Sequence, residues 1–171
     1  MNDKEAKYQL LLEQVKALIE GESDSVAIMA NVAAAIHETM GFFWTGFYRV
    51  VALPKPKGSD TVSSPSKDFG KTHELLLGPF QGPVACMHIG YGRGVCGTAW
   101  KQEKTIVVPD VEQFPGHIAC SSLSRSEIVV PVFDAHGKVN AVLDIDSREH
   151  GTFDDVDSVW LEHICRLLTL S

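Results

Sequence analysis

Hydrophobic residues recur at helical spacing over the first part of the chain. The segment at about residues 3–20 predicts a helix, and Gly21 follows as its stop. The apolar face of that helix is predicted to carry Tyr8, Leu11, Val15 and Leu18. A second helix is predicted to begin after Ser23 or Asp24, either of which can cap it, and to end at Gly41.

Short apolar runs rich in β-branched and aromatic residues then predict strands. They cover residues 44–51, 73–77, 84–89, 105–108, 127–133 and 138–147. Glycines at residues 90–94 predict a turn into a short helix near residues 97–102. Residues 54–72 hold three prolines, two glycines and four serines with few apolar residues, so we expect a surface loop or insertion there.

Helical spacing returns from about Phe153 to Leu170, with Thr152 as the predicted cap. The apolar face of this last helix is predicted to carry Val156, Val159, His163 and Leu167. Helices at both ends of a run of strands predict an α+β fold, with a central antiparallel sheet flanked by helices. The length of 171 residues suits a single domain over residues 1–171.

The charge balance excludes some classes of function. The chain has 15 basic and 22 acidic residues, and a net charge of −7 disfavours binding to nucleic acid. No basic run points to an anionic membrane surface, and no segment reads as a signal peptide or a membrane span. We therefore expect a cytoplasmic protein, in a compartment where paired thiols tend to be catalytic or redox-active.

Four cysteines are candidates for such chemistry. Cys120 lies in a predicted loop, where reactive thiols are often presented, and Cys96 lies at the predicted start of a helix, whose dipole favours a thiolate. Cys86 falls in a predicted strand, and Cys165 in the apolar final helix, where we expect a buried hydrophobe. Burial is also the alternative for the other three. The spacing matches no common zinc pattern, so we expect no metal site.

Three acids form a second candidate group. Asp144 and Asp146 share one face of a predicted strand, and Glu127 begins the strand before it, across a short turn. Carboxylates gathered in a pocket repel, and one keeps its proton, so such a group can donate a proton or bind an ammonium group. The alternative is a solvated strand end that leads into a turn.

Several stretches resemble the free methionine-R-sulfoxide reductases, a branch of the GAF-domain superfamily. They are Trp44–Tyr48, Gly94–Ala99, Phe114–Cys120, Ser126–Pro131 and Leu143–Ser147. The similarity covers nearly the whole chain, in the same order, and the combination is specific. It implies that the α+β domain is a single GAF domain. Residues 54–72 look expanded relative to compact relatives, which could alter access to a pocket.

The resemblance also implies a role for each candidate residue. Cys120 matches the catalytic cysteine, and Cys86 or Cys96 would resolve its oxidised form, with Cys86 the more direct partner. The substrate pocket would be formed by Glu127, Asp144, Asp146, Trp44 and Tyr48. The implied enzyme is an oxidoreductase that reduces free L-methionine (R)-S-oxide to L-methionine.

Further expectations follow from the same resemblance. The enzyme would need no bound cofactor and would receive its reducing equivalents from thioredoxin, which reduces the disulfide by exchange. The preference for the R form comes from the resemblance alone. GAF domains often pair through terminal helices, and the terminal helices here carry apolar faces, so we also expect a homodimer.

Two other functions are compatible with a GAF domain, because a fold does not fix a function. A non-catalytic sensor would bind a small molecule such as a cyclic nucleotide, but three acids do not suit a phosphate, and the chain has no length left for an output domain. A thiol redox switch would form a disulfide without turning over methionine sulfoxide.

Overall fold

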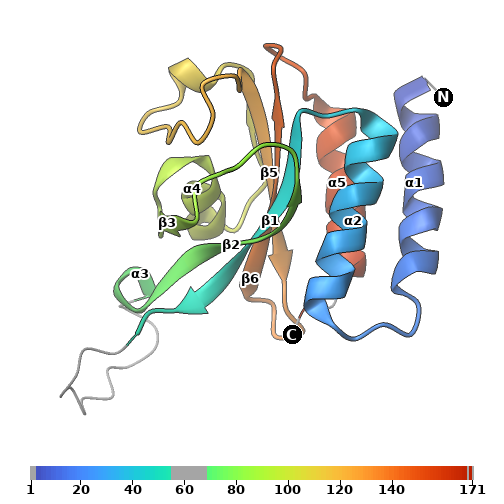
Figure 1. The fold of residues 1–171 in the computed structure, drawn as a ribbon, viewed down its shortest axis with the longest axis horizontal. Helices are drawn as coiled ribbons and strands as arrows, with labels where there is room; N and C mark the ends of the chain where they lie inside the picture. The colour runs from blue at the N-terminus through green and yellow to red at the C-terminus, as the bar shows by residue number, and fades with distance from the viewer. Residues whose placement is uncertain (1–2, 55–68, 169, 171) are drawn as a thin grey trace.

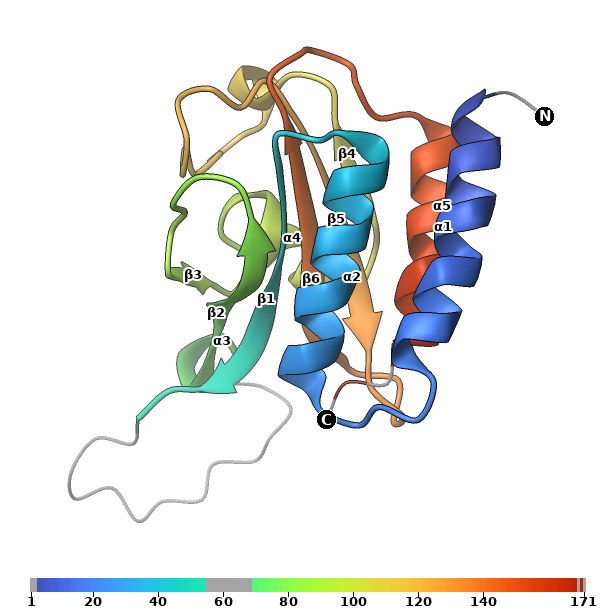
Figure 2. The same ribbon diagram turned by 45° about the vertical axis from the view of Figure 1, so that its right-hand side comes forward.

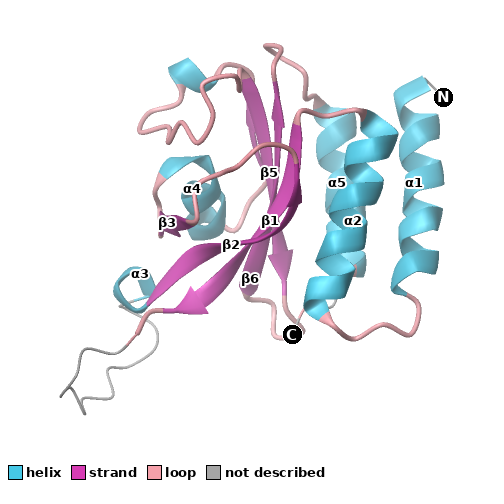
Figure 3. Ribbon diagram, viewed as in Figure 1, coloured by secondary structure: helices cyan, strands magenta, loops and turns pink. Residues whose placement is uncertain are grey.

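The computed structural model of the chain describes residues 3–54, 69–168 and 170, so most of the loop expected at residues 54–72 lies outside the described residues. The predicted elements occur in the predicted order, and two short helices that were not predicted are added, at residues 69–72, within the expected loop, and at residues 111–113 (Figures 1 and 3). They are α1 (Asp3–Ile19), α2 (Ser25–Met40), β1 (Trp44–Ala52), α3 (Phe69–Thr72), β2 (His73–Gln81), β3 (His88–Gly90), α4 (Gly94–Gln102), β4 (Ile106–Val108), the 3-10 helix η1 (Val111–Gln113), β5 (Ser126–Phe133), β6 (Val139–Ser147) and α5 (Asp155–Leu167).

The described strands form one antiparallel sheet in the order β3-β2-β1-β6-β5-β4. The helices α1, α2 and α5 cover one face of this sheet, while α4 and the long segment between β4 and β5 lie over the other face (Figures 1 and 2). The predicted α+β fold is confirmed, and the chain has the sheet-and-helix layers of a GAF domain. The two faces of the sheet therefore have different neighbours.

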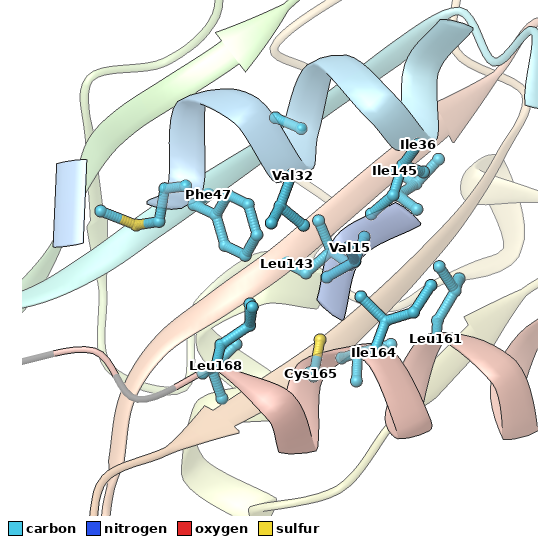
Figure 4. Close-up of a cluster of buried hydrophobic side chains, with 14 of the residues drawn as sticks. Val15, Val32, Ile36, Phe47, Leu143, Ile145, Leu161, Ile164, Cys165 and Leu168 are labelled. Carbon is cyan, nitrogen blue, oxygen red and sulfur yellow. The ribbon is translucent and has the colours of Figure 1, made fainter. Parts of the chain in front are cut away.

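Alternation along the central strands builds the core on the helical side. Phe47 on β1 and Leu143 and Ile145 on β6 are fully buried and point at the three helices (Figure 4). They meet Val15 of α1 and Val32 of α2, which are equally buried. Burying side chains of this size contributes roughly 1.5–3 kcal/mol each. This burial fixes which face of the central strands points to the helices, and the other face is left for the opposite side of the sheet.

The beginning of α5 corrects the prediction that Thr152 caps it. The cap is Asp154, whose carboxylate accepts from the backbone N–H groups of Val156 and Asp157. Thr152 instead donates its hydroxyl hydrogen to Ser147 Oγ, at 2.7 Å. The carboxylate of aspartate accepts hydrogen bonds from the free N–H groups of a first turn at least as well as the hydroxyl of threonine does. Asp154 therefore caps the helix, although Thr152 lies only two residues before it.

The buried face of α5 also differs from the predicted one. Leu161, Ile164 and Cys165 are buried, whereas Val159, predicted to face the core, is 51% exposed. On α1 the prediction is confirmed for the first three residues of its face but is wrong for Leu18, which is 39% exposed. The expectation that Cys165 is a buried hydrophobe is confirmed.

The apolar faces of α1, α2 and α5 pack within this chain, against the sheet and one another. The observation that suggested a homodimer is thus accounted for by the fold of one chain, and the homodimer stays a prediction. Among the helices that the structure describes, none combines the length and the apolar character needed to cross a membrane.

Candidate active site

The three predicted acids meet on the sheet face that lies opposite α1, α2 and α5. Antiparallel pairing of β5 with β6 sets Glu127 directly across from Asp146, and Val129 across from Asp144. Glu127 and Asp144 are 6% and 7% exposed. Residues two apart on a strand share a face, and directly paired residues lie about 5 Å apart, so period and register together gather the carboxyl groups.

A pocket of about 520 Å³, counting its mouth, opens over these acids. Its walls come from β1, the loop after β2, the first turn of α4, the segment before β5, and the strands β5 and β6. Among the residues that line it are Trp44, Tyr48, Cys96, Cys120, Glu127, Asp144 and Asp146. Every predicted site residue except Cys86 is therefore in the lining, and Cys86 is bonded to one that is.

Burial raises the pKa of all three carboxyl groups. For Glu127 and Asp144 the pKa lies well above the ordinary value, because burial is reinforced by repulsion from neighbouring acids, Asp146 foremost. For Asp146 burial raises the pKa to about 6, against opposing contributions from a Ser124 hydrogen bond and from His117. Protons are consequently retained in this group near neutral pH. A retained proton is what a group needs to act as a general acid.

Cys96 lies in the first turn of α4, as predicted, but the predicted thiolate is not favoured there. Burial, followed by repulsion from Asp144 and Glu127, raises the pKa of its thiol well above the ordinary value. At 3% exposure, the cost of burying a charge exceeds what the helix dipole contributes.

The turn before α4 positions Cys96. Gly92 and Gly94 have φ values of 71° and 57°, a conformation that other residues rarely adopt. Gly97 packs against the carbonyl oxygen of Gly90 so closely that a Cβ atom would have no room. The glycines here therefore make a turn, as predicted, and a close contact between backbone segments.

Cys96 also belongs to a set of potential metal ligands. Its Sγ and one carboxylate oxygen each from Glu127 and Asp144 lie within 4.8 Å of one another. A thiolate with two carboxylates is a donor set that Zn²⁺ accepts. The expected absence of a metal stays a prediction.

Cys86 and Cys120 form a disulfide, with their Cα atoms 5.3 Å apart. Cys120 lies in the predicted loop, but the prediction of a strand around Cys86 is wrong, because β3 starts only at His88. Gly82, with a φ of 122°, and Pro83, which has no N–H for a ladder, lead the chain out of the sheet after β2. Freed from strand pairing, Cys86 can approach Cys120.

The two predicted aromatic residues have a second role that the sequence did not indicate. The Tyr48 hydroxyl donates to the carbonyl of Cys86, at 2.9 Å, and Trp44 Nε1 donates to the carbonyl of Pro83, at 3.0 Å. Both side chains thus hold the loop that carries Cys86. Burial and repulsion from Asp144 keep the pKa of Tyr48 far above its usual range, so its hydroxyl stays a donor.

Gly46 lies between these two residues on β1, opposite Asp144. A Cβ atom at this position would collide with the ring of Trp44 and with Phe80. The missing side chain therefore leaves space for the indole ring over the strand.

Two further pocket residues, His117 and Ser124, are not among the predicted site residues. His117 Nε2 lies 3.5 Å from Glu127 Oε2, and Ser124 hydrogen-bonds the Asp146 carboxylate. Both come from the irregular segment before β5, which has no periodicity from which to infer the direction of a side chain. The only signal was the position of His117, three residues before Cys120.

Comparison with known proteins places this geometry in a family. The model of the GAF domain family matches residues 24–171. Among curated proteins, the chain is 50% identical to GAF domain-containing protein A of Dictyostelium discoideum, over 96% of this chain and 92% of that protein. It is 38% identical to the free methionine-R-sulfoxide reductase of Saccharomyces cerevisiae, over 100% of this chain and 88% of that protein.

A solved structure gives the same result. The chain superposes on the free methionine-R-sulfoxide reductase of Neisseria meningitidis, determined in complex with its substrate, with a TM-score of 0.81. Sequence identity is 44%, and the match covers 98% of this chain and 89% of that chain.

Proposed function

Because the chain belongs to the free methionine-R-sulfoxide reductase branch of the GAF domain family, we propose that it reduces free L-methionine (R)-S-oxide to L-methionine. The observation that carries the proposal is a disulfide between Cys86 and Cys120 beside a pocket lined by three carboxyl groups, two of them buried. The proposed substrate is the one for which these relatives are named.

The acids account for a preference for the free amino acid. In the described part of the chain, Oδ1 of Asp144 is buried without a hydrogen-bond partner, which leaves it able to accept from a ligand. The α-ammonium group of free methionine sulfoxide supplies such a donor together with a positive charge that offsets the repulsion among the acids. A methionine within a peptide has no such charge, so its entry would leave the acids unpaired.

Reduction would begin at Cys120, whose side chain lines the pocket. Its thiolate attacks the sulfoxide sulfur, and one of the protonated carboxyl groups gives its proton to the sulfoxide oxygen. The oxygen is transferred to Cys120, which becomes a sulfenic acid, and methionine leaves with its sulfur reduced. Two electrons have then passed from the cysteine to the substrate.

Cys86 would complete the first half of the cycle. Its thiol attacks the sulfenic acid of Cys120, which forms the disulfide and releases water. The bond between these two residues in the structure supports this assignment over Cys96, whose buried thiol is kept protonated. Thioredoxin would then reduce the disulfide with two electrons and two protons. Such reductants keep thiols reduced in the cytoplasm, which is the compartment we propose for the cycle.

The test is turnover of free methionine sulfoxide, with the R and S forms measured separately, in the presence of a thioredoxin system. We expect turnover of the R form, and its loss in Cys120→Ser. The matched control is Cys165→Ala, which also removes a thiol but one that lies in the core opposite the pocket. Its turnover per folded molecule should match that of the native protein.

The same assay separates the alternatives. No turnover of either form by fully reduced native protein would reject the reductase and favour a ligand-binding sensor. Formation of the disulfide with peroxide, but without release of methionine from the sulfoxide, would identify a redox switch.

A further inference from the structure

Exposed apolar side chains lie close in sequence to both cysteines of the Cys86–Cys120 disulfide. Val84 is 87% exposed, Met87 66% and Leu123 51%, and each is at most three residues from one of the two cysteines. Consecutive Cα atoms are about 3.8 Å apart, so all three begin within roughly 11 Å of a bonded cysteine. We call residues 82–87 and 118–124 together the disulfide rim.

The disulfide rim carries no charge. Neither segment contains a lysine, arginine, aspartate or glutamate, in a chain of which 22% is charged. Glu127 and Asp144 of the neighbouring pocket are buried and Asp146 is only partly exposed, so these acids add little charge to this surface. The Arg125 guanidinium lies at the border of the rim, where it donates to the carbonyl of Ser122 at 3.2 Å. An exposed apolar area beside a reactive bond, with a charged group at its margin, is typical of a contact surface for another protein.

We propose that the disulfide rim is the docking surface for the protein dithiol that reduces the disulfide. This inference rests on the proposed function, because the disulfide has to be reduced after every cycle only if the protein is an enzyme that oxidises its own cysteines. Both cysteines are half-buried, so an incoming thiolate has to be guided onto a sulfur atom rather than meet it freely. Contacts of a partner with Met87 and Leu123 would give that guidance.

The docked partner reduces the disulfide by thiol–disulfide exchange in two steps. A thiolate of the reductant attacks one sulfur of the disulfide, forms an intermolecular disulfide and releases the other cysteine. The second thiol of the reductant then attacks the intermolecular bond and leaves as the oxidised partner. The chain gains two electrons and two protons, and both of its cysteines are thiols again.

The backbone of the rim is held in place before any partner arrives. Leu77 N–H donates to the carbonyl of Met87 at 2.8 Å, and Leu123 N–H donates to Ser121 Oγ at 3.2 Å. A surface that is already ordered loses little entropy on binding. A small apolar patch then suffices for a transient complex that must separate after each exchange.

Met87 and Leu123 permit a clean test, because neither lines the substrate pocket, unlike Val84. In Met87→Asp and Leu123→Asp we expect the KM for thioredoxin to rise about tenfold. This is the effect expected from the loss of a contact residue of moderate importance. Turnover driven by dithiothreitol, which needs no docking, should equal that of the native protein. The matched control is Val159→Asp, because Val159 is also 51% exposed but lies on α5, across the sheet from the pocket.

The outcomes separate the two proposals. Native protein that fails to turn over with dithiothreitol refutes the proposed function, and the docking surface with it. Normal turnover with dithiothreitol and an unchanged KM for thioredoxin in both variants refutes the docking surface alone. A KM for native protein that rises steeply with ionic strength also refutes it, because apolar docking is nearly insensitive to salt.

Discussion

Asp146 links the stability of the protein to pH in a direction opposite to that of an ordinary paired acid. Its pKa is about 6 in the folded protein because burial outweighs its favourable contacts, against 3.8 for an unperturbed aspartate. The folded state therefore binds the proton more tightly than the unfolded state. The contribution of this group to stability is complete below pH 3.8 and is lost as the pH rises through about 6.

We predict that Asp146→Asn, which cannot lose a proton, gains stability relative to the native protein as the pH rises from 4 to 7. The difference should reach on the order of 2–3 kcal/mol in the free energy of unfolding, measured by urea denaturation across that range. Asp134→Asn is the control, since backbone N–H groups lower the pKa of Asp134 below its ordinary value of 3.8, so that most of its ionisation occurs below this range. A constant difference between native protein and Asp146→Asn would contradict the prediction.

Individual site residues could be predicted where a regular helix or strand fixes the direction in which the side chain points. Asp144 and Asp146 follow from the period of a strand, and Glu127 follows from the short turn that makes the next strand its neighbour. His117 and Ser124 belong to an irregular segment, whose course depends on tertiary contacts. The protonation of Cys96 depends on its burial and then on charges from two other strands, so its position in the helix alone gave the wrong direction for the pKa shift.

The helices and strands themselves were largely evident from the sequence, and the errors lie at their ends. Cys86 was assigned to a strand because its neighbours are apolar and β-branched, yet these side chains are exposed around a disulfide. A run of apolar residues at the surface has the same sequence pattern as a run that forms a buried strand. Pro83 was the signal against a strand, and it outweighs the apolar run that follows.

The start of α5 is predicted to depend on Asp157, a fully buried acid. Its carboxylate accepts from Tyr8 Oη at 2.7 Å, from Lys4 Nζ at 2.6 Å and from the backbone N–H of Asp154 at 2.9 Å. The group thus completes the capping box of α5 and ties that helix to α1. Removal of the carboxylate leaves the buried Tyr8 hydroxyl and the Lys4 ammonium without this partner.

We expect Asp157→Ala to lower the free energy of unfolding by about 3 kcal/mol, measured by urea denaturation. Asp155→Ala serves as the control, because Asp155 is an acid of the same first turn but is exposed, and its loss should cost about 0.5 kcal/mol. Turnover per folded molecule should be unchanged in both, because α5 lies across the sheet from the pocket. Equal effects of the two substitutions would show that the network adds nothing beyond the helix dipole.

Across the whole molecule, the layer arrangement could be predicted but the order of the strands could not. Helices at both ends of the chain suffice to predict a covered sheet face. The placement of β1 beside β6 joins segments about a hundred residues apart, and no local pattern encodes such a pairing. That pairing is what brings Trp44 next to Asp146 and closes the pocket, so the aromatic wall was assigned from the family resemblance alone.

The disulfide gives the molecule two states of different stability. Cys86 and Cys120 are 34 residues apart, and a cross-link of that span restricts the unfolded chain enough to stabilise the fold by about 3–4 kcal/mol. We predict that the oxidised protein unfolds at a higher urea concentration than the reduced protein by this free energy. Cys86→Ser should unfold at the same urea concentration with and without reductant.

Equal stability of the oxidised and the reduced native protein would mean that the reduced fold already holds the loops together, and that oxidation adds no constraint. A difference of the predicted size would mean instead that each catalytic cycle alternately tightens and loosens the fold, with the reduced, less stable form being the one that meets substrate.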